Sequence, residues 1–258
     1  MKQKLQTHII SNEPLNPQNH LLKLTMISNE AFPTMQPGQF VQILVENSPN
    51  TFLRRPISIH FVDDTRNELW LLVQKAGDGT QRICETKSGD VLDIILPLGN
   101  SFSLPEEKNA KLLLVGGGVG IAPMLFLGKK AKENGFTPHF LLGGRSKSDL
   151  LQLDEFQKYG TLHTTTEDGS AGEKGFVTHH SVLKNDFDFI YTCGPKPMMM
   201  AVAKYAQERG IECEVSLENL MACGFGACLC CVEKTTRGNI CPCTEGPVFN
   251  TKELVWQN

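Results

Sequence analysis

The sequence predicts an antiparallel β-barrel, then a Rossmann-like parallel α/β domain, then a small C-terminal lobe. Short β-branched strands fill the first hundred residues, strand and helix patterns alternate after residue 108, and six of the nine cysteines lie between residues 221 and 249. The expected parts are residues 1–104, 105–215 and 216–258. A chain of 258 residues with 40% hydrophobic content is long enough for two domains and an appendage.

Composition narrows the function classes. The net charge is −3, the pI is near 6.2, and no basic patch suggests a nucleic-acid partner. The N-terminus has no apolar leader and no apolar run is long enough to span a membrane, which predicts a cytoplasmic chain without a membrane partner. Thiols stay reduced in that compartment, so the cysteine cluster is expected to hold metal rather than to form disulfides.

The barrel is predicted from strand-like runs between residues 6 and 98. They read HLLKLTMI, QFVQILVE, PISIHFV, LWLLVQKA and DVLDIILPLG. Turn signals such as Pro37-Gly38 and Ser88-Gly89-Asp90 separate them. Short strands with regular turns are typical of a small antiparallel barrel.

Beyond the polar stretch at residues 105–108 the pattern changes. Strand-like runs KLLLV, TPHFLLGGR, GTLHTTTEDG and DFIYTC alternate with helical stretches, and IECEVSLE leads into the cysteines. This alternation predicts a parallel sheet covered by helices on both faces.

A glycine-rich turn follows the strand KLLLV directly and opens a helix. Glycines let a pyrophosphate approach the backbone, and a helix N-terminus offers free N–H groups to it. The alternative is a tight strand-to-helix turn without a ligand. The candidate nucleotide-binding residues are Gly116, Gly117, Gly118, Val119, Gly120 and Pro123.

A second turn, TCGPKPMMMAV, also ends a strand and begins a helix. Ligands of open α/β sheets lie at this edge, so Cys193, Gly194 and Pro195 are further nucleotide candidates. The methionines at 198–200 are interpreted as core residues.

The run FLRRPISIHF places two arginines before a proline inside a strand. Pro56 has no N–H to donate, so this strand is expected at an edge or a bulge, where Arg55 and the Ser58 hydroxyl can face a ligand. An arginine pair is otherwise a solvated surface feature. The downstream glycine turn KAGDGTQRI offers backbone N–H groups to a phosphate.

Cys223, Cys228 and Cys231 have the C-x4-C-x2-C spacing of plant-type [2Fe–2S] ferredoxins, with Cys241 or Cys243 as the fourth ligand. Four thiolates also suit tetrahedral zinc, but zinc ribbons favour two C-x2-C knuckles, which this segment lacks. The spacing therefore favours an iron–sulfur cluster.

Several motifs together resemble one branch of the ferredoxin-reductase family. RRPISI, GGGVGIAP, TEDGSAGEKG, CGPKPMM, MACGFGACLCCV and CTEGPVF occur in this order over nearly the whole chain. They resemble the electron-transfer subunits of two-subunit, NAD-linked dihydroorotate dehydrogenases. That branch has a FAD-binding barrel, a nicotinamide-nucleotide domain and a [2Fe–2S] lobe.

The resemblance implies which residues contact FAD: Arg55, Pro56, Ile57, Ser58, Leu72, Val73, Gln74, Gly79 and Thr80. Arg55 would face the pyrophosphate and Ser58 the isoalloxazine. The sequence departs from the family pattern at Ile57, where an aromatic residue is common, and at Gln74, where close relatives often have arginine.

The resemblance also implies the fourth cluster ligand. Relatives have one cysteine just before the acidic-Gly-Pro-Val-Phe run, which makes Cys243 the ligand and leaves Cys241 and Cys230 as bystanders.

The implied activity is electron transfer. NAD(H) would lie across both glycine motifs with Cys193 near the nicotinamide, and hydride would pass between nicotinamide and FAD with no catalytic acid or base. Electrons would come from the FMN of a separate dihydroorotate dehydrogenase catalytic subunit in pyrimidine biosynthesis. Relatives form heterotetramers of two subunits of each kind.

Two other functions remain open at this stage. One is a flavin and [2Fe–2S] reductase subunit of a ferredoxin:NADP or hydrogenase complex, because Arg145 could meet a 2′-phosphate. The other is a non-enzymatic zinc-binding adaptor.

Overall fold

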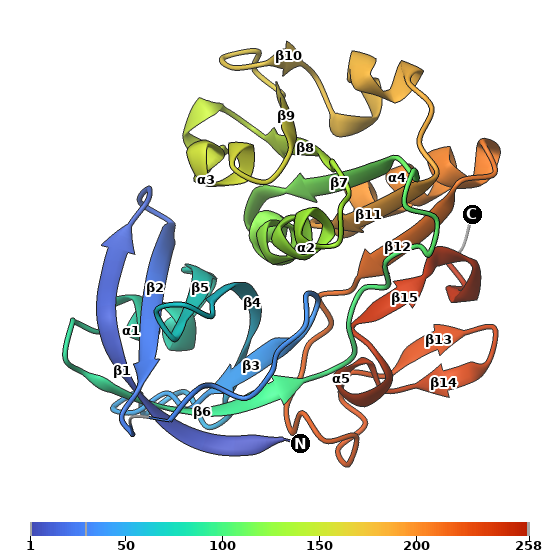
Figure 1. Ribbon diagram of the computed structural model, residues 1–258. Coiled ribbons are helices and arrows are strands. Elements are labelled where there is room, and N and C mark those ends of the chain that lie inside the picture. The colour runs from blue at the N-terminus through green and yellow to red at the C-terminus, as the bar shows by residue number, and fades with distance from the viewer. Residues whose placement is uncertain (1, 29, 257–258) are drawn as a thin grey trace.

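The computed structural model describes residues 2–28 and 30–256 and confirms the predicted fold class of a barrel followed by a parallel α/β sheet. The barrel is closed and antiparallel, with strands in the order β1-β2-β5-β4-β3-β6 (Figure 1). Its elements are β1 Gln3–Pro14, β2 Asn19–Met26, β3 Phe40–Ile43, β4 Arg55–Asp63, β5 Glu68–Gln74, α1 Asp78–Cys84 and β6 Val91–Leu98.

Alternating burial explains why these runs form the barrel. Along β6, Leu92, Ile94, Leu96 and Leu98 are buried, while the residues between them are partly open. A period of two places one apolar face inside, as expected for a strand with one side in a core.

The second part is a sheet with strand order β10-β9-β8-β7-β11-β12-β15 in the described part of the chain. Its strands are β7 Leu112–Gly117, β8 His139–Gly144, β9 Thr161–Thr166, β10 Glu173–Lys174, β11 Phe189–Cys193, β12 Glu212–Ser216 and β15 Val248–Asn250. The helices are α2 Ala122–Glu133, α3 Leu153–Gln157 and α4 Lys196–Glu208.

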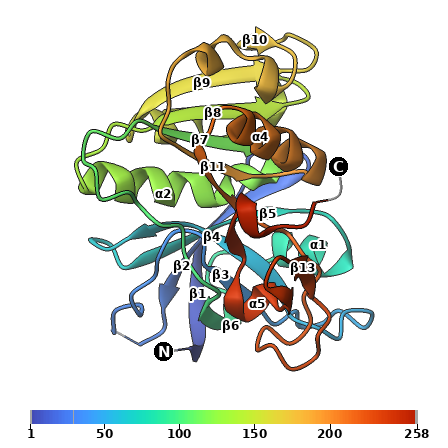
Figure 2. The ribbon, with the colours of Figure 1, turned by 90° about the vertical axis from the view of Figure 1, so that its right-hand side faces the viewer.

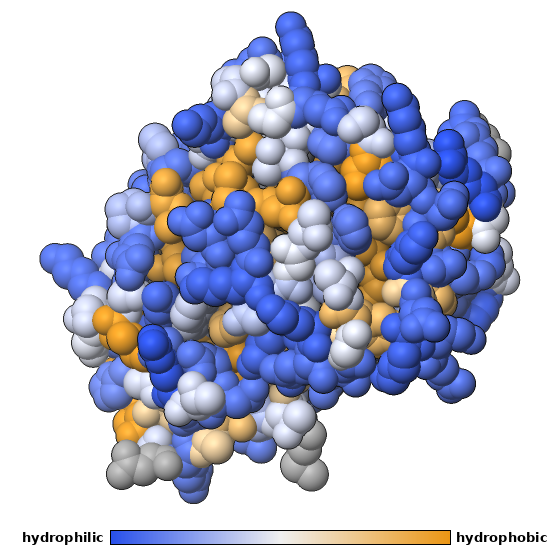
Figure 3. All heavy atoms as spheres, turned by 45° about the horizontal axis from the view of Figure 1, so that its top comes forward, coloured by the Kyte–Doolittle hydropathy of each residue, from blue (hydrophilic) through white to orange (hydrophobic). Residues whose placement is uncertain are grey.

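Both faces of this sheet are covered, as Figure 2 shows. Leu112 and Leu114 on β7 point into the core shared with α2, whereas Leu113 and Val115 point into the core shared with α4. Strands buried on both faces read as continuous apolar runs, which is why KLLLV shows no alternation. On the face that comes forward in Figure 3, hydrophilic residues cover most of the surface and hydrophobic residues are visible in the recesses between them.

The cysteine segment leaves the end of β12 and returns to the same sheet. β15 pairs antiparallel with β12, with Val215 opposite Phe249, and the segment between them contains α5 Pro242–Glu245 and the hairpin of β13 Glu233–Thr235 and β14 Gly238–Ile240. Met221 and three buried cysteines of this segment pack against Phe40 and Leu98 of the barrel. The lobe therefore shares its small core with the first domain (Figure 1, red against blue and green).

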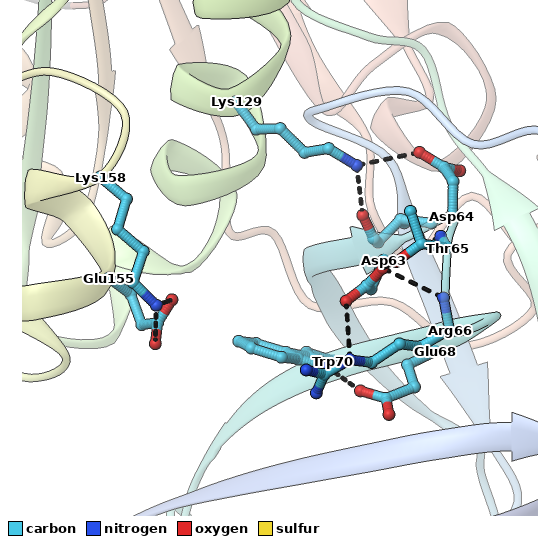
Figure 4. Close-up of polar contacts among 10 residues, drawn as sticks. Asp63, Asp64, Thr65, Arg66, Glu68, Trp70, Lys129, Glu155 and Lys158 are labelled. Carbon is cyan, nitrogen blue, oxygen red and sulfur yellow. Dashed lines mark hydrogen bonds and ion pairs between the residues drawn. The ribbon is translucent and has the colours of Figure 1, made fainter.

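The barrel and the nucleotide sheet meet at α2 (Figure 4). Lys129 on α2 donates to the Val62 carbonyl at 2.7 Å and to Asp64 at 2.9 Å. The Asp63 carboxylate accepts the Thr65 N–H at 3.0 Å and shapes the β4–β5 turn that presents these groups. The turn is thus held rigidly against the neighbouring domain.

His60 is a second, fully buried link between the two domains. Its Nδ1 lies 2.8 Å from the Ala122 carbonyl oxygen and its Nε2 lies 2.5 Å from Gln152 Oε1. Burial lowers the pKa of His60, which favours the neutral ring in the folded protein.

We expect acid to weaken this link. Since the folded-state pKa of His60 lies below the unfolded value, the stability it contributes is present above about pH 6.5 and falls as the pH drops below that value. One additional bound proton in the unfolded state lowers the free energy of unfolding by about 1.4 kcal/mol per pH unit. Thermal unfolding between pH 7.5 and 5.0 should therefore show a shallower pH slope for His60→Gln than for the unchanged protein. The exposed His179→Gln is the control, and identical slopes for His60→Gln and the unchanged chain would contradict the assignment.

Candidate functional site

The predicted flavin residues on β4 and β5 lie at the ends of these strands that are not paired with each other in the described residues. Residues 55–58 of β4 pair with β3, but the ladder between β4 and β5 begins only at Ile59 opposite Leu71 in the described residues. At Pro56 the strand is therefore paired on one side only among the residues that the structure describes, as an edge strand is, and a register shift follows between Ile59 and Phe61. Residues 55–58 and 72–74 therefore face each other without ladder pairs between them.

Leu72 and Val73 are 2% and 0% exposed, because their side chains belong to the hydrophobic cores. Only the backbone of these two residues could reach a flavin. Gln74 is exposed, and its backbone pairs with Asn19 of β2.

The start of α1 lies against Arg55. A Cβ on Gly79 would come within 2.5 Å of Arg55 Nε and 3.0 Å of Thr51 Cγ2, so the arginine side chain lies directly on this glycine. The Thr80 hydroxyl accepts the Ala76 N–H at 2.9 Å and donates to the Gly77 carbonyl at 3.0 Å. Thr80 thus holds the glycine turn in shape, and the fold brings together the two segments predicted to contact a pyrophosphate.

The two predicted nucleotide motifs also touch each other. Cys193 at the end of β11 is in register with Gly116 at the end of β7, and a side chain on Gly120 would collide with the Gly194 backbone. Gly118 has φ +56° and open space where a Cβ would be. It is the position of this turn at which a ligand can approach the backbone most closely.

The structure gives one of the methionines a place in this site. Met199 is buried in the core and Met198 packs against it, as predicted. The Met198 side chain also lies against Gly117 and Gly194, a contact with the glycine motifs that the sequence interpretation did not include.

Cys193 faces a carboxyl group that the sequence analysis did not single out. Its buried Sγ lies 3.8 Å from Glu218 Oε1, just beyond the end of β12. Burial raises the pKa of the Cys193 thiol and that of the Glu218 carboxyl, although part of Glu218 is open to solvent. Glu218 has no sequence motif of its own, and only the adjacency of β11 and β12 places it beside Cys193.

The predicted cluster ligands lie on one loop and on α5. Gly224 and Gly226 have φ values of +74° and +78°, and these left-handed positions let the loop curl around the sulfurs. The Phe225 N–H donates to Cys223 Sγ at 3.3 Å and the Gly226 N–H donates to Cys243 Sγ at 3.2 Å. The bond from Phe225, together with bonds from Cys228 and Ala227, lowers the pKa of Cys223 to about 6.

The predicted ligands lie as neighbours within the segment. Cys228 neighbours Cys223, and Cys231 neighbours both Cys243 and Cys241. Within the described ranges, no three His, Cys, Asp or Glu side chains are arranged to hold one metal ion. A two-iron cluster takes two thiolates on each iron, so neighbouring cysteines fit this group, and N–H donors to its sulfurs tune its potential.

The remaining cysteines of the segment differ from each other. Cys230 is exposed, whereas Cys241 is buried next to the Cys231 sulfur. The choice of Cys243 over Cys241 as the fourth ligand stays a prediction, and both thiols are within reach of Cys231.

None of the helices in residues 2–28 and 30–256 combines the length and the apolar character needed to cross a lipid bilayer.

Two known families match this chain. Residues 218–255 match the iron-sulfur cluster binding domain of dihydroorotate dehydrogenase B, and residues 114–204 match the oxidoreductase NAD-binding domain. The first match includes all four predicted cluster ligands, and the second includes both glycine motifs.

Several known proteins match most of this chain. A Shouchella clausii protein named dihydroorotate dehydrogenase B (NAD(+)), electron transfer subunit, is 40% identical over 85% of this chain and 86% of its own length. A protein of the same name from Caldanaerobacter subterraneus is 36% identical over 99% of this chain and 100% of its own length. A solved structure of NADH-dependent reduced ferredoxin-NADP oxidoreductase, described for flavin-based electron bifurcation, aligns with a TM-score of 0.85 at 31% identity over 97% of this chain and 90% of that one.

Proposed function

Because this chain belongs to the family of electron transfer subunits of dihydroorotate dehydrogenase B, we propose that it passes electrons between a dihydroorotate-oxidising catalytic subunit and NAD+. One observation carries the proposal. Strand β3 is paired on one edge with residues 55–58 of β4, and Phe40 of the same strand packs against the cysteines of the lobe. The predicted flavin residues and the predicted cluster residues therefore both contact strand β3.

Each group has residues that fit it. Arg55, Ser58, the backbone of residues 72–74 and the turn at Gly79 would hold FAD, and the four predicted cysteine ligands would hold [2Fe–2S]. When bound, FAD exchanges a hydride with the nicotinamide, and the cluster accepts and releases single electrons. In this scheme the chain contributes orientation and electrostatics rather than an acid or a base.

The residues of the nucleotide edge have separate tasks. Gly118 admits the pyrophosphate of NAD(H), while Gly120 keeps the two turns in contact. Cys193 and Glu218 form the wall against which the nicotinamide would lie. Burial raises the pKa of both groups, so Cys193 contributes a neutral thiol to this wall.

The cofactors can be tested directly on the chain purified without oxygen. We expect about one FAD, two irons and two acid-labile sulfides per chain, and reduction of ferricyanide by NADH at a much higher rate than by NADPH. A preference for NADPH would support the reductase subunit of a ferredoxin:NADP complex instead. A colourless protein containing zinc would refute the proposal.

We further propose that the catalytic partner, an FMN-containing subunit in a two-plus-two assembly, docks on the cysteine loop. The loop exposes four apolar side chains, Leu220, Phe225, Leu229 and Val232, which are 84%, 50%, 63% and 38% exposed. Apolar side chains gathered around a redox centre are suited to an interface because they exclude water when covered. Electrons from the FMN of the partner would then enter the cluster on its exposed side.

Replacing Leu229 by asparagine should weaken association with the catalytic subunit at least tenfold. Leu229 has φ +57°, a conformation that asparagine adopts more easily than leucine, so the variant should fold and keep its cluster. Binding can be measured by titrating the catalytic subunit in an interferometer. Phe176→Asn, at a 58% exposed site on the nucleotide domain, is the control, and equal binding by both variants would argue against this surface.

A further inference from the structure

Gln42 joins the two predicted redox sites. Its backbone lies opposite Pro56 in the ladder between β3 and β4, within the segment that would hold the flavin. Its side chain, in a residue that is 1% exposed, reaches in the other direction and donates from Nε2 to the Ala222 carbonyl at 3.3 Å. Ala222 directly precedes the cluster ligand Cys223.

The contact between Gln42 and the cysteine loop is a close one. A Cβ on Gly224 would lie 2.8–2.9 Å from Cδ, Nε2 and Oε1 of Gln42, so the loop backbone rests directly on the amide group. Gly224 also has φ +74°, which a side chain would strain. Glycine at position 224 therefore allows the loop to pack directly on the Gln42 amide.

Gln42 is itself anchored from the barrel. Arg54 Nη1 donates to the Gln42 carbonyl at 3.4 Å and to the Asp93 carbonyl at 3.0 Å, and Arg54 Nη2 is 2.6 Å from Asp93 Oδ1. The ion pair is mostly buried, with side-chain exposures of 17% and 10%. Gln42 thus has little freedom to follow the loop if the loop moves.

The residues that follow Gly224 supply the N–H groups to the sulfurs. Phe225 donates to Cys223 and Gly226 donates to Cys243, and these two N–H groups directly follow Gly224, on which the Gln42 amide lies. Hydrogen bonds to the sulfurs stabilise the reduced, more negative cluster and raise its reduction potential.

We propose that Gln42 is a positioning residue for electron transfer: it holds residues 222–226 so that Phe225 and Gly226 donate to the cluster sulfurs, and it ties this loop to the flavin-binding strand. The inference rests on the proposed function, since it concerns the same cluster and flavin. Under this proposal, Gln42 of the barrel raises the reduction potential of a cluster that is bound by the C-terminal lobe.

Gln42→Met is the decisive variant because it keeps the length and volume of the side chain and removes the amide. At a fixed potential, we expect the ratio of reduced to oxidised cluster to fall about tenfold, which corresponds to 59 mV for one electron. Electron paramagnetic resonance during a redox titration measures this ratio. Hydrogen exchange at the amides of Phe225 and Gly226 should also become faster.

Asn12→Ala is the matched control. Asn12 is a partly buried amide of the same barrel, and among the described residues its side-chain hydrogen bonds, including those to the Cys84 and Thr86 carbonyls, all lie within the barrel domain. It should lose barrel stability and leave the cluster potential unchanged.

The remaining outcomes are distinct. Loss of iron from Gln42→Met with FAD retained also supports the positioning role, whereas loss of both groups, or an unchanged potential with unchanged exchange, overturns it. If the unchanged protein binds neither iron nor sulfide, the proposed function fails. In that case, hydrogen exchange at the Phe225 and Gly226 amides of Gln42→Met and of the unchanged protein still shows whether Gln42 orders residues 222–226.

Discussion

Replacing Cys243 by serine should remove most of the iron and acid-labile sulfide from the purified protein while leaving FAD in place. Cys243 is 1% exposed, accepts the Gly226 N–H and lies beside Cys231, so its loss leaves one iron with a single protein thiolate. Iron and sulfide per chain, together with the visible spectrum, measure the effect. NADH-dependent reduction of a one-electron protein acceptor should fall at least a hundredfold.

Two neighbouring cysteines provide the controls. Cys230→Ser, at an exposed position, should bind the cluster normally. Cys241→Ser should also retain it, and the double variant Cys241→Ser with Cys243→Ser should contain less iron than Cys243→Ser alone if Cys241 acts as a weak substitute. If Cys243→Ser kept its full iron content and Cys241→Ser lost iron, Cys241 would be the fourth cluster ligand and Cys243 would not.

Replacing Arg55 by alanine should produce protein that loses FAD on gel filtration. A charge-assisted hydrogen bond to a phosphate contributes about 1.5–3 kcal/mol, which corresponds to a weakening of roughly 10- to 100-fold in FAD affinity. Fluorescence of released flavin measures the dissociation constant. The cluster should stay bound, because its ligands are carried by the loop and α5 rather than by β4.

Arg66→Ala separates this effect from a general loss of positive charge. Arg66 pairs with Asp63 at the surface of the β4–β5 turn, with 69% of its side chain exposed, and should bind FAD normally. Gly79→Ala tests the role of Arg55 in a second way and should also weaken FAD binding. The added methyl group would displace Arg55, whose Nε lies 2.5 Å from the position of the new Cβ. Unchanged FAD affinity in both Arg55→Ala and Gly79→Ala would remove Arg55 from the flavin site.

The structure also changes how the cysteine lobe should be viewed. Its last strand, β15, is part of the nucleotide sheet, and its buried cysteines pack on Phe40 and Leu98 of the barrel. Asn100, in the connection between the two domains, donates to the Val248 carbonyl at 2.8 Å. The lobe is thus held by both domains, which places the cluster at their junction.

Several features could be determined from the sequence because each depends on residues that are close together in the chain. Alternating burial in β6 and the apolar run of β7 report which face of a strand meets a core, and this pattern is local. The spacing of Cys223, Cys228 and Cys231 likewise reflects what one loop must do to surround a cluster. The order of the domains, the fold class and the family followed from such local patterns.

Other features depended on which distant segments come into contact, and only the tertiary structure decided them. Gln42 meets Ala222 across 180 positions of the chain, His60 meets Gln152 across 92, and Glu218 reaches Cys193 from the neighbouring strand. A lone glutamine, histidine or glutamate carries no periodic signal, because its role is set by packing against elements elsewhere in the sequence. The sequence therefore determined the parts and their cofactors, while the packing of those parts decided which distant side chains meet where the parts join.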